Sequence, residues 1–467
     1  MKWKHHKHYV RKALYIVGIL LLITFIYHQV KPLPPGVSLQ GAQWNISDEH
    51  ITFLADYTFT RDNETVREHE IFDTLFVGLA EAEESILLDM FLFNNDYSHE
   101  PQYREITDEL TSLLLEQSDK EIVFITDHLN TFYGSYMPRH LNALSSAGIT
   151  VVYTDMNKMR DSNPLYTSFW RVLFRWIPLP IRMPHPLGNQ EHTVTVSSLL
   201  EVATARANHR KVAVIDGTHA LITSANPHTA SSGHSNVGVL FTSGAVQEIL
   251  ASEQNVAEFS GSDIQISNKE IVTEGPMQMQ LLTEGKIREG ILQDIRATEA
   301  GDVITVMAFY ISDRKIVREL KRAAERGVEV VMVLDANKDA FAREKNGIPN
   351  RQVARELAEY ATIRWYHTTG EQYHTKMIII EKQDEVIVHL GSANYTKRNL
   401  GDYNLEMNVR VATPHGTQFE QDVDSYRLRI VENIDGLFTQ PLDAYYDPSR
   451  FRYLLYRFQE WTGLSTF

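Results

Sequence analysis

The body of the chain is one pattern of helices and strands written twice, and this internal repeat restricts the fold more than any other feature. The first copy alternates helical apolar spacing with strand-like runs, in the order 71–82, 86–93, 106–117, 121–127, 141–148 and 149–155. The second copy repeats that order in 287–298, 303–310, 315–327, 328–335 and 361–368. Buried strands that alternate with helices are typical of α/β units. The sequence therefore predicts an α/β fold of two repeated domains, with helices on both faces of each sheet.

The length of 467 residues suits two domains behind a short N-terminal segment. The interval from Asp127 to His209 is 82 positions, whereas the matching interval from Asp335 to His374 is 39, so the first copy carries an insertion near 157–200. The expected division is a basic flank and transmembrane anchor in 1–30, a linker in 31–50, a first domain in 51–267 and a second domain with a helical C-terminal tail in 268–467.

The N-terminal segment is apolar from Ala13 to Tyr27 and has no formal charge between Lys12 and Lys31. A bilayer span needs about 17–25 such residues, so this run is just long enough. Five basic residues precede it, which predicts a cytoplasmic N-terminus and a body outside the cytoplasm, in a single-pass protein of the cell membrane. No small-x-small cleavage pattern follows the run, which favours an uncleaved anchor over a signal peptide.

Charge and cysteine content exclude several classes of protein. Removing the five N-terminal basic residues from the 45 Lys and Arg leaves 40 against 60 Asp and Glu, a net charge of −20 for the body. Such an acidic surface is a poor general binder of nucleic acid, and no nucleic-acid partner is expected. The chain has no cysteine, hence no disulfide framework, thiolate metal site or cysteine nucleophile. The sequence predicts no particular oligomeric state.

Each copy ends in the same polar motif, H-x-K-x4-D or its Glu variant. The predicted catalytic residues are His209, Lys211 and Asp216 in the first copy, and His374, Lys376 and Glu381 in the second. Alternation along a strand places His and Lys on one face. Each motif is followed by Ser-x-Asn, and these residues are predicted to bind a substrate phosphate: Ser224, Asn226, Ser392 and Asn394. A single H-x-K is usually an ordinary strand edge, but two complete sets in matching places are strong evidence for a site.

This set of residue types suits attack on a phosphodiester. A neutral imidazole can displace an alkoxide from phosphorus and form a covalent phosphohistidine, and a second, protonated histidine can give the leaving oxygen its proton. Two lysines, with Ser and Asn donors, would hold the phosphoryl oxygens without a metal. The sequence has no HExxH pattern near its other histidines, so no metal and no cofactor are predicted.

The motifs resemble those of the phospholipase D superfamily, and the chain looks like the bacterial cardiolipin synthases and other phospholipase D-like proteins within it. The resemblance covers most of the chain after residue 50 and rests on HxKxxxxD followed by GSxN, found twice. It implies two domains that pack face to face around one shared site. Glu381 stands where this family usually has Asp, and Thr223 stands where it usually has Gly.

The two copies differ twelve positions beyond the Asn of Ser-x-Asn, where the second has Glu406 and the first has Gly238. In the resembled family an acid near this place often orients a catalytic histidine. A carboxylate beside an imidazole raises its pKa. If Glu406 reaches His374, that ring stays protonated, which predicts His209 as the nucleophile and His374 as the general acid.

Two segments are candidates for contact with lipid. The insertion contains Leu165 to Pro184, where Trp170, Leu173, Phe174 and Ile177 could form an apolar face, with Arg171 and Arg175 beside it. Such a segment can lie in a lipid interface or pack on the protein as a lid. The tail from Phe451 to Trp461 is similar in composition, and a helix docked on the core is the favoured reading there.

The anchor, the aromatic and basic insertion and the acidic body together favour a phospholipid substrate at a membrane. The resemblance implies a phosphodiesterase or phosphatidyltransferase of the cardiolipin synthase type, which transfers a phosphatidyl group between phosphatidylglycerol molecules. The alternatives are a phospholipase D hydrolase that releases phosphatidic acid, a nuclease-type phosphodiesterase and a non-enzymatic lipid-binding module. Fold alone does not choose among them.

Overall fold

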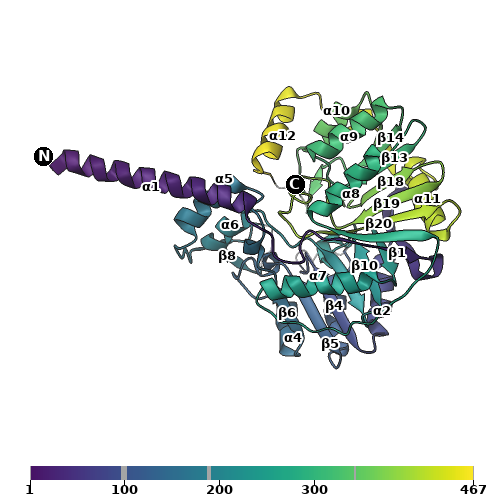
Figure 1. Cartoon of the computed structure of the whole chain (residues 1–467), viewed down its shortest axis with the longest axis horizontal. Helices are drawn as coiled ribbons and strands as arrows, with labels where there is room; N and C mark the ends of the chain where they lie inside the picture. The colour runs from purple at the N-terminus through teal and green to yellow at the C-terminus, as the bar shows by residue number, and fades with distance from the viewer. Residues whose placement is uncertain (1, 96–102, 187–190, 341–342, 466–467) are drawn as a thin grey trace.

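The computed structural model describes residues 2–95, 103–186, 191–340 and 343–465. It consists of two mixed α/β units stacked on one another, with one long helix projecting from the side (Figure 1). The predicted fold class is confirmed. Residues 187–190 of the expected insertion, Met1 and residues 466–467 lie outside the described residues.

The first sheet has eight strands in the order β3-β2-β11-β10-β9-β4-β5-β6. They are β2 (Ile51–Arg61), β3 (Glu64–Glu68), β4 (Ser85–Met90), β5 (Glu121–Thr126), β6 (Thr150–Tyr153), β9 (Lys211–Ile215), β10 (His219–Thr223) and β11 (Asn236–Phe241). Strands β4, β5 and β6 are parallel, and β9 joins β4 antiparallel. Helices α2 (Ile71–Ala80), α3 (Ile106–Glu116) and α4 (Arg139–Ser146) cover one face and bury Leu75, Leu110 and Leu141 there.

The second sheet repeats this arrangement in the order β1-β12-β20-β19-β18-β13-β14-β17-β21. Its strands are β1 (Gln40–Ile46), β12 (Met277–Thr283), β13 (Val303–Ala308), β14 (Glu329–Leu334), β17 (Thr362–Tyr366), β18 (Lys376–Glu381), β19 (Glu385–Gly391), β20 (Met407–Pro414) and β21 (Thr439–Pro441). Its outer face is covered by α8 (Gly285–Arg296), α9 (Arg314–Glu325) and α10 (Asn350–Leu357). The parallel β13-β14-β17 and the antiparallel β18 match β4-β5-β6 and β9.

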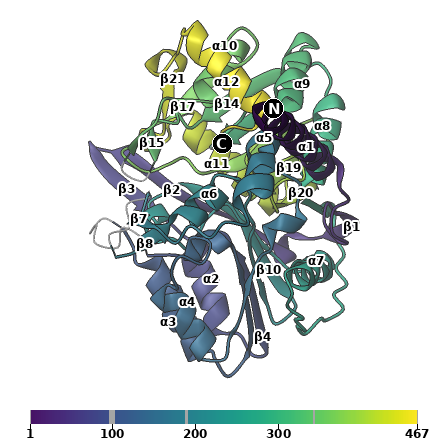
Figure 2. The same cartoon turned by 90° about the vertical axis from the view of Figure 1, so that its left-hand side faces the viewer.

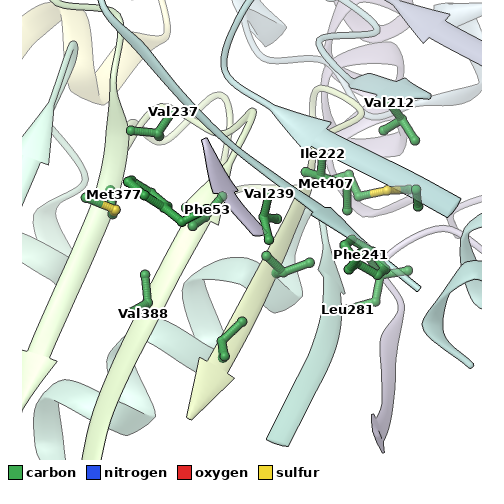
Figure 3. Packing of buried hydrophobic residues seen from close by; sticks show 14 of the residues in the cluster. Phe53, Val212, Ile222, Val237, Val239, Phe241, Leu281, Met377, Val388 and Met407 are labelled. Atoms are coloured by element: carbon green, nitrogen blue, oxygen red, sulfur yellow. The ribbon is translucent and has the colours of Figure 1, made fainter. Parts of the chain in front are cut away.

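The inner faces of the two sheets pack against each other in one continuous apolar cluster. Figure 3 shows its centre, where side chains from both sheets interdigitate: Phe53, Val212, Ile222, Val237, Val239, Phe241, Leu281, Met377, Val388 and Met407. Helices α7 (Ala245–Phe259) and α11 (Gln418–Val431) add to this cluster at its margins. Helices therefore contact both faces of each sheet, and the shared core fixes the two motif strands, β9 and β18, relative to one another.

In one place, the division between the two sheets differs from the division between the two copies of the repeat. Residues 40–46 fall in the segment expected to be a linker, but they form β1, which pairs antiparallel with β12 of the second sheet. The first strand of the body therefore belongs to the sheet of the second copy. The predicted boundary between 267 and 268 stays a prediction.

Helix α1 (Lys2–Val30) projects from the body, and its part from Lys7 to Val30 is long and apolar enough to cross a membrane. None of its apolar window is buried in the protein. Its C-terminal end is fastened to the insertion, because Gln29 Nε2 donates to Asp161 O at 2.7 Å and Lys31 Nζ donates to Asn157 O at 2.7 Å. The insertion forms α5 (Pro164–Phe169), the short π-helix η4 (Trp170–Phe174), the hairpin β7 (Arg182–Pro184) with β8 (Thr193–Thr195), and α6 (Val196–Val202).

The apolar face that was expected in the insertion is partly buried and partly exposed. Trp170 is buried, whereas Trp176 is 74% exposed, with Phe174 and Ile177 also exposed. The tail forms α12 (Arg450–Thr462), which docks on the second core through Tyr456 as expected. Its other side leaves four large apolar residues exposed: Phe451, Leu454, Phe458 and Trp461. Figure 2 looks onto the side from which α1 projects and shows α5, α6 and α12 on that same side.

Candidate active site

The two motif histidines are held at equivalent places by a reciprocal exchange between the copies. His209 lies two residues before the buried Lys211 that opens β9, and its backbone N–H donates to Leu405 O of the second copy at 2.9 Å. His374 lies two residues before the buried Lys376 that opens β18, and its N–H donates to Ser235 O of the first copy at 2.9 Å. Each half therefore positions the histidine of the other.

Asp127 and Asp335 reinforce these positions. Asp127 Oδ2 accepts the N–H of Asn208 at 2.7 Å, and Asp335 Oδ2 accepts the N–H of Tyr373 at 2.8 Å. Asp127 also caps the 3₁₀ helix η2 (His128–Thr131). Both carboxylates therefore hold the residue that precedes a motif histidine.

The ring nitrogens face different partners. His209 Nδ1 lies 3.0 Å from Glu406 Oε2, and His374 Nδ1 lies 3.1 Å from Asn236 Oδ1. The side chain of Asn236 is oriented by its own Nδ2, which donates to His234 O at 3.1 Å. In both rings an oxygen acceptor favours the tautomer with the proton on Nδ1, which leaves Nε2 for the chemistry.

The expectation that Glu406 reaches His374 is wrong, because Glu406 contacts His209 across the domain interface. The position that corresponds to Glu406 is Asn236 and not Gly238. Ser224 N donates to Val237 O, and Ser392 N donates to Met407 O, so Val237 and Met407 are equivalent. The loop between the Asn of Ser-x-Asn and this position is two residues shorter in the first copy. Counting the same number of positions in both copies therefore pairs Glu406 with the wrong residue of the first copy.

The Ser hydroxyls of Ser-x-Asn are engaged with these same partners. Ser224 Oγ donates to Asn236 Oδ1 at 3.1 Å, and Ser392 Oγ donates to Glu406 Oε2 at 2.5 Å. This geometry corrects the expectation that they bind phosphate, since each orients the group that holds a histidine. Asn399 Nδ2 donates to the other oxygen of Glu406, so both carboxylate oxygens are fixed.

The side-chain oxygens of the Asn residues in Ser-x-Asn are less fully hydrogen-bonded within the protein. Asn226 Oδ1 accepts a long bond from Leu92 N at 3.4 Å, and the buried Asn394 Oδ1 has no partner among the described residues. A buried amide oxygen without a partner costs free energy, which is tolerated most readily where a ligand completes the site. These two residues keep their predicted place as substrate contacts.

The two lysines make the site strongly electropositive. Lys211 Nζ donates to His209 O at 2.5 Å and lies 5.0 Å from the centre of the Phe91 ring. Lys376 Nζ donates to His374 O at 2.6 Å and lies 5.2 Å from the centre of the Phe309 ring. Both ammonium groups are fully buried, and neither forms an ion pair within the described part of the chain. Among the residues that the structure describes, Glu406 supplies the only carboxylate that contacts a motif histidine.

Burial controls the titration of these groups. It lowers the pKa of Lys211 to about 7, and together with Lys211 it holds the pKa of Lys376 well below its usual value. Burial also lowers the pKa of His209 to about 4, against the opposing effect of Glu406. No carboxylate of the described segments contacts His374, and burial followed by Lys376 keeps its pKa well below the usual value. A bound anion would stabilise the charged form of all four groups and so raise the pKa of each.

Two of the predicted catalytic carboxylates lie away from this centre. Asp216 and Glu381 each follow their Lys by five strand residues, which is about 16 Å. Asp216 accepts the N–H groups of residues 83–85, which begin β4. Glu381 pairs with Arg427 on α11 at 3.1 Å. Both therefore anchor the far end of the motif strand, and they are corrected from catalytic to structural positions.

The sequence analysis missed three features of the site. Asn236 holds His374, and Phe91 and Phe309 pack on the two histidines with ring centres 4.8 and 5.0 Å apart. His234 lies 5.8 Å from His374 between ring centres. Phe91 and Phe309 lie near the C-terminal ends of corresponding predicted strands, so the repeat itself contained a signal for them.

Two buried strands each present a His-Lys pair to one interface, and the predicted resemblance to the phospholipase D superfamily is confirmed. More particularly, residues 291–427 match the family described as cardiolipin synthase, PLD-like domain. This match supports a phospholipid-modifying enzyme. No curated protein matches the sequence.

Solved structures resemble the chain at low sequence identity. The phosphatidylserine synthase of Haemophilus influenzae Rd KW20 is 11% identical with a TM-score of 0.54, over 91% of this chain and 96% of that one. Polyphosphate kinase from Porphyromonas gingivalis is 12% identical with a TM-score of 0.44, over 89% of this chain and 56% of that one. NucT from Helicobacter pylori is 17% identical with a TM-score of 0.27, over 33% of this chain and 96% of that one. The first of these supports the fold, and the other two likenesses are too weak to bear on it.

Proposed function

We propose that the chain is a membrane-anchored phosphatidyltransferase of the cardiolipin synthase type, which moves a phosphatidyl group from one phosphatidylglycerol to another through a phosphohistidine. The observation that carries the proposal is the pair of buried His-Lys motifs at one interface, with Glu406 as the sole carboxylate partner of a motif histidine among the described residues. Such a site favours a phosphodiester anion, because four basic groups share the one carboxylate of Glu406. The match to the cardiolipin synthase family and the apolar helix α1 favour a phospholipid over other phosphodiesters.

In the first step, Nε2 of His209 attacks phosphorus as the bond to the leaving glycerol oxygen breaks, and His374 gives that oxygen a proton. We propose His209 as the nucleophile, as the sequence also predicted, but the physical reason is a different one. Its ring becomes cationic when the N–P bond forms, and Glu406 at 3.0 Å stabilises that cation. Lys211 and Lys376 would balance the charge of the non-bridging oxygens.

In the second step, His374 acts as a base. It takes the proton from the hydroxyl of the accepting glycerol, whose oxygen attacks phosphorus while the N–P bond breaks. The products are cardiolipin and glycerol, and both histidines return to their starting state. With water in place of the alcohol, the same two steps release phosphatidic acid.

Product analysis with purified protein and vesicles of phosphatidylglycerol tests the proposal. We expect cardiolipin and free glycerol in equal amounts, with no product from the His209→Ala variant. Phosphatidic acid as the sole product would make the protein a hydrolase. The absence of any product under conditions in which the protein is folded and inserted would contradict the proposal.

A further inference from the structure

A groove lies where α1 meets the body, apart from the motif histidines. It is a groove of about 890 Å³ between the last turns of α1 and the insertion. One wall is the side of α1 that carries Leu20, Thr24 and Tyr27, and the opposite wall includes Arg175 and Trp176. The volume falls in the range of pockets that take small amphiphilic molecules.

The groove is rich in positive charge, although the body as a whole carries −20. Its basic residues are Lys31, Lys158, Arg171 and Arg175. Arg171 is neutralised by Asp161, with Nη2 to Oδ1 at 2.9 Å. Lys158 and Arg175 are exposed and form no ion pair within the described part of the chain. Asp155 is the one carboxylate that lines the groove, and it already accepts the N–H of Asn157 at 3.0 Å.

The position of Arg175 matches that of a headgroup contact. Its guanidinium lies 5.8 and 5.5 Å from the ring centres of Trp170 and Trp176, which hold it above the groove wall. Trp176 is 74% exposed beside it. Arginine and tryptophan together are typical of the interface where headgroups meet hydrocarbon. A guanidinium outside any ion pair binds a phosphate through charge-assisted and often bidentate hydrogen bonds.

The groove opens where a bilayer around α1 would end. Leu20 and Thr24 belong to the apolar run that begins at Ala13, and Lys31 follows it. The side that carries the groove also carries α5 and α12 with their exposed apolar residues (Figure 2). The bonds of Gln29 and Lys31 to the insertion fix the angle at which α1 leaves the body.

The groove also adjoins a second, smaller cavity. This cavity of about 170 Å³ shares Asp155 and Asn157 with the groove, and its lining includes Asp127 and Arg206. Asp127 is the residue that holds Asn208, next to His209. The smaller cavity therefore has residues in common both with the groove and with the support of the motif.

We propose that the groove binds one phospholipid from the leaflet that α1 enters, with the headgroup phosphate on Arg175 and Lys158 and an acyl chain along Leu20 and Thr24. The site is a loading position for the lipid substrate, and this part of the proposal rests on the proposed function. Binding itself does not, because the groove lies outside the motif.

Lipid retention in the His209→Ala background, in which bound lipid is not consumed, tests binding. Protein is extracted from phosphatidylglycerol vesicles into mild detergent, and the fraction that carries one phospholipid is measured by native mass spectrometry. We expect Arg175→Glu to lower that fraction about tenfold, the size of one lost charge-assisted contact. Thr24→Trp should lower it similarly by filling the groove.

Two substitutions outside the groove serve as matched controls. Ile23→Trp places the same ring on a part of α1 that does not line the groove, and Arg139→Glu makes the same charge change on the exposed first turn of α4. Both should retain lipid as the parent does. Equal loss in the test and control variants would overturn the proposal, as would retention in all of them. Displacement of the lipid by inorganic phosphate alone would assign the groove to free phosphate and also overturn it.

Activity separates this inference from the proposed function. With His209 restored, Arg175→Glu and Thr24→Trp should slow the reaction of vesicle phosphatidylglycerol but leave a short-chain, soluble phosphodiester unaffected. Lipid retention without any product from the wild-type protein would leave the groove standing and remove the proposed function. Normal vesicle activity in both variants would remove the loading role and leave the proposed function intact.

Discussion

Glu406 makes the two halves of the site chemically unequal. It contacts His209 at 3.0 Å, while the equivalent Asn236 offers His374 only a neutral amide. In catalytic triads, a carboxylate that is hydrogen-bonded to a histidine fixes the tautomer of the ring and stabilises the cation that forms on it. In the proposed mechanism, this difference of one residue type selects His209 as the histidine that carries the phosphoryl group.

Glu406→Gln should reduce kcat by about 10²- to 10⁴-fold, because the variant keeps the shape of the side chain but loses the charge that stabilises the cationic ring. Steady-state kinetics with phosphatidylglycerol vesicles measures this. The control is Glu381→Gln, at a carboxylate paired with Arg427 far from the histidines, which should change kcat less than tenfold. Similar losses in the two variants would contradict the role of Glu406.

The lowered pKa of Lys211 predicts that kcat/KM depends on pH. Burial lowers its pKa to about 7, so a rise in pH through 7 removes one positive charge from the free site. Substrate binding then weakens, and kcat/KM should fall above pH 7 while kcat falls less, because bound phosphate raises the pKa of the lysine. A pH profile of both parameters checks this, and a kcat/KM that is flat from pH 6 to 9 would contradict it.

At the scale of elements, strand β9 faces two environments. His209 and Lys211 point to the site, whereas Arg210 between them points to the opposite side and is fully buried. Its guanidinium bonds to Glu253 at 2.9 Å and to Glu284 at 2.8 Å, and Glu284 in turn accepts the N–H of Glu406 at 3.1 Å. The charged cluster behind the strand therefore supports the residue that orients His209.

Arg210→Met should lower the free energy of unfolding by about 3–5 kcal/mol, because it leaves two carboxylates buried without their partner. Chemical denaturation of the solubilised protein measures the loss. The control is Arg61→Met, which removes an exposed pair with Asp435 and should cost less than about 1 kcal/mol. Equal effects of the two substitutions would show that the buried cluster is not what stabilises β9.

The repeated elements were predictable from the sequence because their signal is local. Helix α2 and strands β4, β5, β13 and β14 lie where apolar spacing placed them. Strand β1 was not predicted, since it pairs with β12, far along the chain, and a local pattern does not reveal a distant partner.

In the site, the His-Lys pairs could be predicted, whereas the partner of Glu406 could not. That contact crosses the domain interface, and a loop shorter by two residues shifts the apparent counterpart from Asn236 to Gly238. The Ser hydroxyls were placed wrongly for a related reason. A motif predicts that Ser224 and Ser392 are near the site but not which neighbour each bonds to.

At the scale of the whole molecule, α1 is long and apolar enough to be the membrane anchor that the proposed function requires. None of the apolar window of α1 is buried in the protein, and five basic residues precede that window in the sequence. A reporter enzyme that works only outside the cytoplasm, fused after Phe467, should therefore be active. The same reporter fused ahead of Met1 should be inactive, and the reverse result would invert the proposed topology.

Trapping the covalent intermediate tests the central claim most directly. Protein is mixed with a radiolabelled phosphodiester whose leaving group needs no proton, quenched, digested and mapped by mass spectrometry. The account predicts the phosphoryl group on His209, an adduct that persists in His374→Ala, and no adduct in His209→Ala. The paired variant Asn236→Asp with Glu406→Gln moves the carboxylate to the other ring and should move the adduct to His374. An adduct on His374 in the wild-type protein would contradict the account.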